Sequence, residues 1–216
     1  MGMRRYIFIA FIVIGLLAPP ALAQQTPVTD STCPVSTAQV VLDPGHGGDD
    51  PGAVNESFGL TEAELNLTIA QQVASILERD HGLTVALTRV DNATTLGNSA
   101  RGAIANACHA SLYVSIHLNG ADDPNADYAQ SFWGEKEKDL AFSLIMNASL
   151  ASLGIRVNAV DRFDNGGLLR ARMPSVLVEG VFLTNPVEAL LLKAQIRQTA
   201  IAQSIAAGIA AWFARW

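Results

Sequence analysis

Residues 40–48 read VVLDPGHGG, and this stretch decides the fold. Its first three residues are apolar, which is typical of a short buried strand. The strand ends at Asp43, and the glycines that follow allow the backbone to turn sharply beside His46. Because open α/β sheets bind their ligands at the carboxyl ends of the strands, the pattern predicts that His46 lies at a ligand-binding edge.

Two later segments end in the same way. Residues 111–117 (SLYVSIH) are a predicted strand that closes with His117, and residues 175–179 (SVLVE) are a predicted strand that closes with Glu179. Carboxyl ends of parallel strands meet at one edge of a sheet, so we expect these two side chains to lie near His46.

Helical patterns separate the strands. Residues 61–64 (TEAE) form a capping box, and apolar residues at helical spacing then predict a helix from Glu62 to about Arg79. Further expected elements are a strand over 83–89, helices over 101–107, 136–153, after Asn185-Pro186 and over 201–213, and a loop over 154–174 with a strand near Leu168-Leu169. This alternation predicts an α/β fold with a mostly parallel sheet covered by helices on both faces.

The composition suits one globular domain. The chain has 216 residues, of which 50% are hydrophobic and 16% charged. Its formal charge of -6 argues against a nucleic-acid partner, which would require a surplus of Lys and Arg.

The first residues are interpreted as a secretory signal. Arg4 and Arg5 precede an apolar run that is short for a membrane span, and Ala21-Leu22-Ala23 resembles a cleavage site. The alternative is an uncleaved anchor. We expect a signal peptide over residues 1–23, a flexible linker over 24–38 and a catalytic domain over 39–216. We therefore expect an exported protein that is located in the periplasm, with secretion into the medium as the alternative. No stable membrane insertion is expected after cleavage.

Two cysteines remain after such cleavage. Cys33 and Cys108 each precede one of the predicted strands that end in histidine. If those strands are parallel neighbours, both thiols lie at the same end of the sheet and can form a disulfide. Two free thiols are the alternative, because spacing does not determine pairing. A cysteine-based zinc site is disfavoured, since the chain has no CxxC.

Each candidate side chain also has an ordinary structural explanation. Glu62 alone reads as an acid that favours the helix dipole, and His117 alone as a core histidine. A P-loop at His46 is excluded because no Lys-Ser/Thr pair follows. Glu179 is harder to explain structurally, because a carboxylate at the end of an apolar strand is costly to bury.

Taken together, these residues indicate metal chemistry. Two histidines and one glutamate around an open position are a catalytic zinc arrangement, and a second glutamate nearby can accept a proton from the attacking water. We expect Asp43 to orient His46 from behind.

The ordered set of motifs resembles a known family. Residues 41–48, Glu62 with Asn66, residues 87–89 (LTR), 115–117 (SIH) and 174–179, followed by Asn185-Pro186, resemble the zinc-dependent N-acetylmuramoyl-L-alanine amidases of bacterial cell walls, over about residues 39–215.

The resemblance implies a site and a reaction. It implies one zinc ion per chain with His46, Glu62 and His117 as ligands, Glu179 as the catalytic acid and base, and a single twisted sheet flanked by helices. The implied reaction hydrolyses the amide bond between the lactyl group of N-acetylmuramic acid and L-alanine in peptidoglycan or muropeptides.

Several alternatives stay open at this point. A zinc carboxypeptidase-like enzyme acting on stem peptides would use the same metal set, and a wall-binding module without catalysis is a third reading. Arg156, Arg170 and Arg172 could hold peptide carboxylates or lie solvated on the surface. An activator protein and the oligomeric state do not follow from the sequence.

Overall fold

The structure is a computed structural model that describes residues 32–215. The predicted signal peptide and the first part of the predicted linker lie outside the described residues. No helix within residues 32–215 is both long and apolar enough to cross a membrane.

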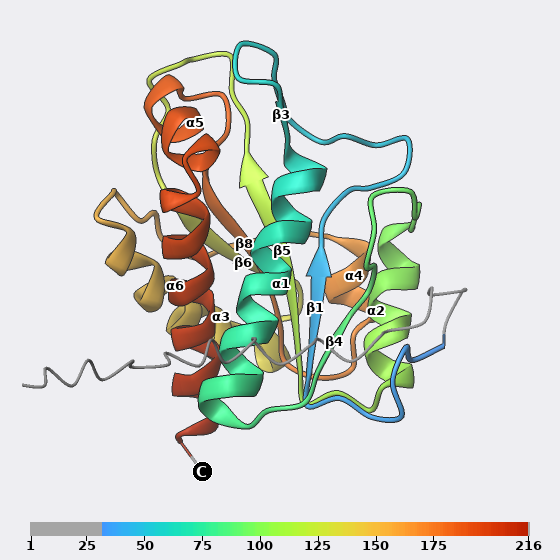
Figure 1. Cartoon of the computed structure of the whole chain (residues 1–216). Coiled ribbons are helices and arrows are strands. Elements are labelled where there is room, and N and C mark those ends of the chain that lie inside the picture. The colour runs from blue at the N-terminus through green and yellow to red at the C-terminus, as the bar shows by residue number, and fades with distance from the viewer. Residues whose placement is uncertain (1–31, 216) are drawn as a thin grey trace, which may run out of the picture.

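One six-stranded sheet forms the centre of the molecule (Figure 1). In spatial order its strands are β4 (Val85–Leu87), β1 (Val40–Pro44), β5 (Leu112–Asn119), β8 (Ser175–Phe182), β6 (Gln130–Trp133) and β7 (Asp161–Arg162). The first four are parallel neighbours, β6 runs antiparallel to β8, and β7 runs parallel to β6. A separate hairpin pairs β2 (Val54–Asn55) with β3 (Leu60–Thr61). The predicted mostly parallel sheet is confirmed.

Helices cover both faces of this sheet, as predicted (Figure 1). One face packs against α1 (Glu62–His81), α3 (Lys136–Leu150), α5 (Pro186–Lys193) and α6 (Ile196–Phe213), with a 3-10 turn, η1 (Ala151–Leu153), after α3. The other face packs against α2 (Asn98–Ala107) and α4 (Gly166–Arg170).

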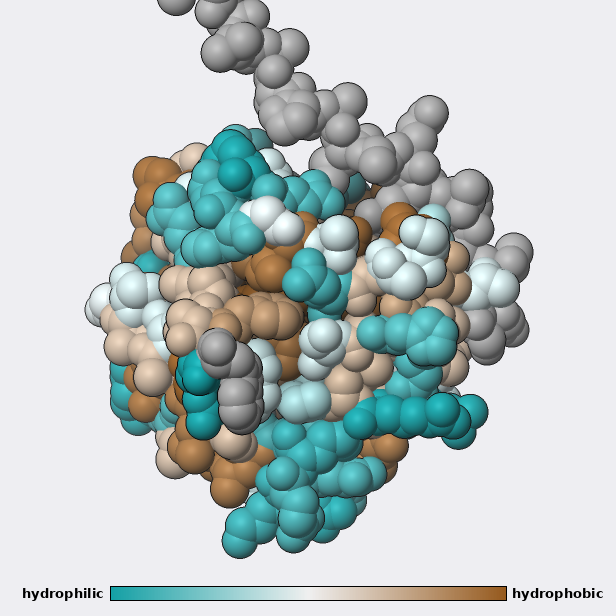
Figure 2. Space-filling model, turned by 90° about the horizontal axis from the view of Figure 1, so that it is seen from below, coloured by the Kyte–Doolittle hydropathy of each residue, from teal (hydrophilic) through white to brown (hydrophobic). Residues whose placement is uncertain are grey.

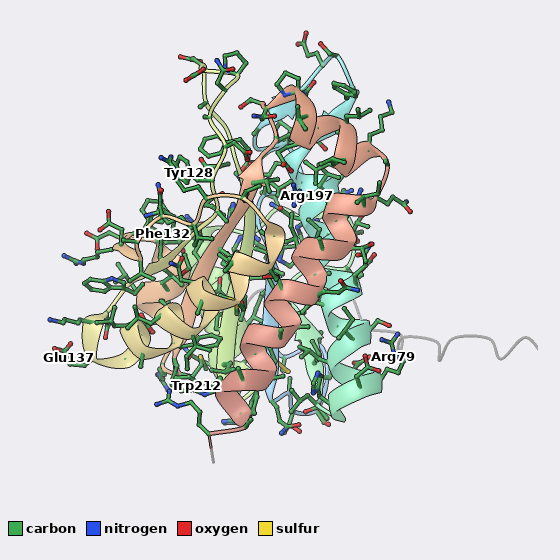
Figure 3. All side chains as sticks on the ribbon, turned by 90° about the vertical axis from the view of Figure 1, so that its left-hand side faces the viewer. Arg79, Tyr128, Phe132, Glu137, Arg197 and Trp212 are labelled. Carbon is green, nitrogen blue, oxygen red and sulfur yellow. A yellow bond between two sulfur atoms is a disulfide. The ribbon has the colours of Figure 1, made fainter. Side chains whose placement is uncertain are left out.

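The strand residues explain why both faces are covered. In β1, Val40 and Leu42 belong to the core under α1 and α6, whereas Val41 belongs to the core under α2. A strand that is apolar on both faces is typical of a parallel sheet buried between two helical layers. In the α1 layer, Trp212 of α6 meets Phe142 of α3 edge to face at 5.2 Å between ring centroids (Figure 3).

The long helix α1 begins where the capping box predicts. The side chain of Thr61 accepts a hydrogen bond from the Glu64 amide, and Gly82 ends the helix with a φ of 63°. This start places Glu62 in the first turn, directly after the loop that follows β1.

Several short elements were not predicted, among them the hairpin strands β2 and β3. The expected strand near Leu168-Leu169 is wrong, because these residues lie in α4, which the Asn165 side chain caps by accepting from two backbone amides. The two glycines of the Asn-Gly-Gly sequence hide this turn of helix, since glycine disfavours helix formation. The strands β6 and β7 were also missed, and the strand expected over 83–89 is only Val85–Leu87.

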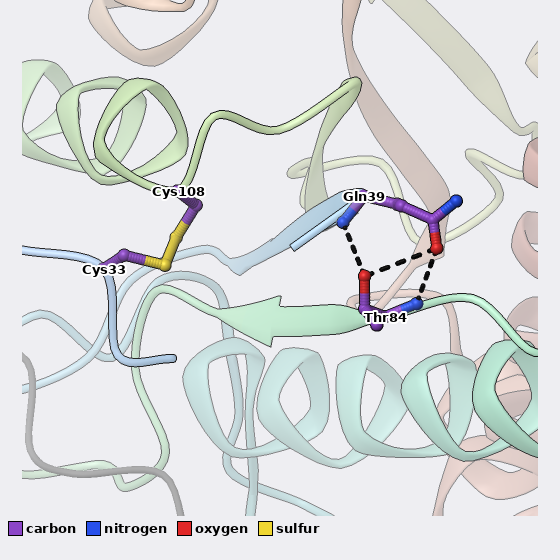
Figure 4. Close-up of a disulfide and its surroundings, with 4 residues drawn as sticks. All are labelled: Cys33, Gln39, Thr84 and Cys108. Carbon is purple, nitrogen blue, oxygen red and sulfur yellow. Dashed lines mark hydrogen bonds between the residues drawn. A yellow bond between two sulfur atoms is a disulfide. The ribbon is translucent and has the colours of Figure 1, made fainter. Parts of the chain in front are cut away.

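Cys33 and Cys108 form a disulfide (Figure 4). The strands β1 and β5, which follow the two cysteines, are parallel neighbours, so both cysteines lie at the same end of the sheet, as predicted. The two-thiol alternative is therefore wrong. Cys33, Val35 and Ala38 pack against the core under α2, so the last residues of the predicted linker contact the domain. Close by, Gln39 and Thr84 make three hydrogen bonds that involve their side chains. Seen from the amino ends of the parallel strands, the surface mixes hydrophilic and hydrophobic residues (Figure 2).

Candidate active site

The structure brings His46, Glu62 and His117 together at the carboxyl ends of the parallel strands. His46 follows β1, Glu62 begins α1, and His117 lies in β5. The Nε2 atom of His46 is 3.1 Å from Glu62 Oε1, and Nδ1 of His117 is 3.0 Å from the same oxygen. One candidate ligand atom from each of the three residues lies within 4.8 Å of the others. Two imidazole nitrogens and a carboxylate oxygen are donors that zinc accepts, so this cluster can hold a divalent metal ion.

Glycines allow the three side chains to approach one another. A Cβ atom at Gly45 would lie 2.2 Å from Cε1 of His117, and one at Gly52 would lie 2.6 Å from Oε2 of Glu62. His46 itself has a φ of 62°, in the left-handed region that a non-glycine residue rarely adopts. Larger residues at the two glycine positions would therefore displace the candidate ligands.

Asp50 determines which nitrogen His46 presents to the cluster. Oδ2 of Asp50 lies 2.8 Å from Nδ1 of His46, and Oδ1 of Asp50 accepts from the Gly52 amide at 3.0 Å. A carboxylate at Nδ1 favours the tautomer that carries its proton there and leaves the lone pair of Nε2 free to bind a metal ion.

The expectation that Asp43 orients His46 is wrong. Asp43 is buried beneath the turn, and its two oxygens accept hydrogen bonds from Thr88, Arg101, Tyr113 and Ser115. Burial alone would raise the pKa of Asp43, but the charge of Arg101 and the hydrogen bonds lower it to about 2. Arg101 also donates to the carbonyls of Pro44 and His46, so Asp43 supports the turn through Arg101 and not through the imidazole.

A second buried arginine ties the turn to α1. Arg89 donates to the carbonyls of Pro44, Gly45 and Ala63, at 2.8 to 2.9 Å. Burial and the nearby charge of Arg101 lower the pKa of Arg89 to about 10. These contacts hold the residues before His46 against the residue after Glu62.

The surroundings keep Glu62 ionised. Its oxygens accept from the amides of Ala53 and Leu118 and from the side chain of Asn66. Burial opposes ionisation, but hydrogen bonds and charge from His117 and His46 hold the pKa of Glu62 well below its usual range.

The pKa of His46 is raised in the same cluster. Burial lowers it, but the hydrogen bond and charge of Glu62, followed by those of Asp50, raise it to about 9. A metal ion at this position competes with a proton on His46, so metal binding would release that proton.

Glu179 lies beside this cluster on the neighbouring strand β8, in register with His117. Its Oε2 atom is enclosed and has no hydrogen-bond partner among the described residues. Burial raises the pKa of Glu179 to about 7; His117 opposes this shift and the charge of Glu62 adds to it. A carboxyl group with a pKa near neutrality can both accept and return a proton.

One pocket of about 300 Å³ lies against His46, His117 and Glu179. It is lined by His46, Asp50, Leu96, Asn98, Arg101, His117, Phe163, Asn165, Leu177 and Glu179. The three arginines that were candidates for substrate contacts do not line it. Arg172 lines a different hollow beside Asn106 and His109, and Arg156 lies over the ring of Tyr128 at 4.9 Å.

Asp50 and Asn165 are among the pocket residues that the sequence reasoning missed. Asp50 is four residues after His46, a spacing that could have suggested a contact within the loop. Asn165 precedes two glycines and a short apolar run, which is a weak helix-capping signal. Nothing in the sequence places Asn165 near His46, because that proximity depends on the packing of α4 on α2.

Comparisons with known proteins agree with this geometry. The model of the N-acetylmuramoyl-L-alanine amidase family matches residues 40–211. The chain is 33% identical over 191 residues to the uncharacterised protein YqiI of Bacillus subtilis, covering 87% of this chain and 90% of YqiI. It is 31% identical over 183 residues to LytH of Staphylococcus aureus, named "Probable cell wall amidase", covering 83% of this chain and 60% of LytH.

A solved structure shows the same architecture. The catalytic domain of CwlV, an N-acetylmuramoyl-L-alanine amidase from Bacillus (Paenibacillus) polymyxa, superposes with a TM-score of 0.76 at 31% identity. The match covers 81% of this chain and 97% of that domain. From its sequence and its fold, the chain belongs to the N-acetylmuramoyl-L-alanine amidase family.

Proposed function

We propose that this protein hydrolyses the amide bond between the lactyl group of N-acetylmuramic acid and L-alanine in peptidoglycan, using one zinc ion held by His46, Glu62 and His117. The observation that carries the proposal is the convergence of these side chains from three separate segments, with the enclosed Oε2 of Glu179 beside them. Family membership supports the reaction, and the donor set supports the metal.

Glu179 and Asp50 have different proposed roles in this hydrolysis. When bound, zinc supplies a Lewis acid that polarises the scissile carbonyl and lowers the pKa of the attacking water. Glu179 takes a proton from that water on its carboxylate and then gives it to the nitrogen of the departing L-alanine. Asp50 keeps the proton of His46 on Nδ1, so that Nε2 remains available as a donor to the metal.

We also propose that the protein works outside the cytoplasm. The substrate class is part of the cell wall, and residues 1–23 have the pattern of a cleaved export signal. The disulfide between Cys33 and Cys108 fits an oxidising compartment such as the periplasm.

The test is digestion of purified peptidoglycan with the chelated and the zinc-restored protein, followed by mass spectrometry. The expected products are stem peptides with a free L-alanine amine and glycan with a free lactyl carboxylate, formed only with zinc. Release of a terminal amino acid from the stem peptide would instead favour the carboxypeptidase alternative. Tight wall binding without any cleavage would favour the binding module.

Variants separate the two glutamates. Glu179→Ala should retain zinc and lose turnover, whereas Glu62→Gln should lose zinc and turnover together. Glu64→Gln is the matched control for the second change, because Glu64 lies in the same first turn of α1 but is exposed. Activity in Glu179→Ala, or normal zinc affinity in Glu62→Gln, would contradict the assigned roles.

A further inference from the structure

Asn165 combines a structural contact with an unused hydrogen-bond donor. Its Oδ1 accepts from the amides of Gly167 at 2.7 Å and Leu168 at 3.4 Å, which caps α4. Because two backbone donors point at this atom, the other terminal atom of the side chain is the amide nitrogen Nδ2. The residue is only 8% exposed.

A second asparagine in the same setting shows what is unusual. Asn185 caps α5 with the same geometry, accepting from the amides of Val187 and Glu188, and it is also 8% exposed. Its Nδ2 donates to the carbonyl of Ala126 at 3.3 Å. Nδ2 of Asn165, by contrast, donates to no residue between 32 and 215, and it is not among the enclosed atoms that lack a partner. It therefore keeps access to solvent.

The pocket that Asn165 lines is the candidate active site. Asn165 lines the pocket of about 300 Å³ that also contains His46, His117 and Glu179. The pocket thus holds a donor whose position is fixed by the cap on α4 and whose hydrogen bond is not made within the protein. Fixed donors of this kind are what an active site uses to bind a substrate oxygen.

We propose that Nδ2 of Asn165 donates a hydrogen bond to a carbonyl oxygen of the bound muropeptide. The inference rests on the proposed function, which it deepens by naming a substrate-binding residue. A neutral amide oxygen is the expected acceptor, because Asp50 and Glu179 line the same pocket and disfavour an anionic group. Arg101, the cation beside them, is already bound to Asp43.

The decisive variant is Asn165→Ser. Serine is also a good helix cap, so it can replace the acceptor at α4 while removing the amide donor. We expect zinc content and the unfolding temperature to stay close to wild type. We expect kcat/KM on a defined muropeptide to fall about tenfold if the donor binds the ground-state carbonyl, mainly through KM. A fall of about a hundredfold in kcat is expected if it binds the oxygen that becomes negative in the transition state.

Asn185→Ser is the matched control. It makes the same chemical change at an equivalent cap outside the pocket, and it removes the bond to Ala126. This variant should unfold at a lower temperature and retain kcat/KM. Equal losses of kcat/KM in the two variants would show that capping, and not substrate binding, explains the effect at Asn165, and would overturn the proposal.

A binding measurement keeps this inference separate from the proposed reaction. Calorimetry with the same muropeptide and the zinc-loaded Glu179→Gln protein, with and without Asn165→Ser, needs no turnover. A wild type that cleaves no lactyl amide would overturn the proposed function alone. Affinity and kcat/KM both within about twofold of their parents in the Asn165→Ser proteins would overturn the inference about Asn165.

Discussion

Replacement of Glu179 by glutamine should stabilise the metal-free protein at alkaline pH and not at acidic pH. The reason is the enclosed carboxylate oxygen without a partner, which makes ionisation of Glu179 unfavourable in the fold. Glutamine has nearly the same shape and never ionises. The pH-dependent part of their difference in stability should therefore appear only where Glu179 carries a charge.

The sign and the size follow from the pKa of Glu179. The fold raises it from the ordinary value of 4.5 to about 7, so the folded state holds this proton more tightly than the unfolded state. Below about pH 4.5 both states are protonated and the contribution vanishes. As the pH rises from about 4.5 to 7, the wild type loses stability, and above that range the loss is complete. A shift of roughly 2.5 units corresponds to about 3 kcal/mol.

Urea unfolding in chelator at about pH 4 and about pH 8 measures this effect by linear extrapolation. At each pH, the unfolding free energy of the wild type is subtracted from that of the variant. The value at about pH 4 is then subtracted from the value at about pH 8, so that any fixed cost of the glutamine amide cancels. Glu64→Gln, on an exposed side chain, serves as the control and should show little change. A change at Glu179 below about 1 kcal/mol, less than one pKa unit, would refute the reasoning.

Two further predictions concern Asp50 and the disulfide. Asp50→Asn should weaken zinc binding about 10- to 100-fold, measured by competition with a chromophoric chelator, because it removes the carboxylate 2.8 Å from Nδ1 of His46. Its exposed neighbour Asp49, changed to Asn, is the control, and equal affinities for the two variants would contradict the role of Asp50. The double variant Cys33→Ser/Cys108→Ser should lose about 2–4 kcal/mol of unfolding free energy, because the bond closes a loop with a sequence separation of 75. Its zinc affinity should be unchanged, since both cysteines precede strands that carry the site at their opposite ends; a large loss of zinc would show coupling that the structure does not contain.

The sequence predicts well the parts of the site that belong to, or directly follow, a regular element. His46 follows β1, His117 and Glu179 lie in the second halves of β5 and β8, and a local capping box marks the helix that begins at Glu62. Parallel pairing brings the carboxyl ends of these strands to one edge of the sheet. The position of these residues can therefore be predicted without knowing their individual contacts.

The parts that failed depend on contacts between distant residues. Asp43 comes shortly before His46 in the chain, which suggested a direct contact. Its oxygens are instead occupied by donors that are 45 to 72 residues away, among them Thr88, Arg101 and Ser115. No local sequence pattern predicts hydrogen bonds between residues so far apart in the chain. The same applies to Asn165, whose place in the pocket depends on α4 packing on the α2 face of the sheet.

The order of elements has a consequence for how such an enzyme can diversify. The groups proposed for bond cleavage come from β1, α1, β5 and β8, whereas Phe163 and Asn165 reach the pocket from the single excursion between η1 and β8. That excursion passes through the outermost strand of the sheet, and Phe163 presents 48% of its surface to solvent. The donor proposed to bind substrate and the groups proposed to break the bond therefore lie in separate stretches of the polypeptide. A chimaera in which residues 154–173 come from a relative should therefore prefer a different muropeptide, while the residues proposed for bond cleavage stay unchanged.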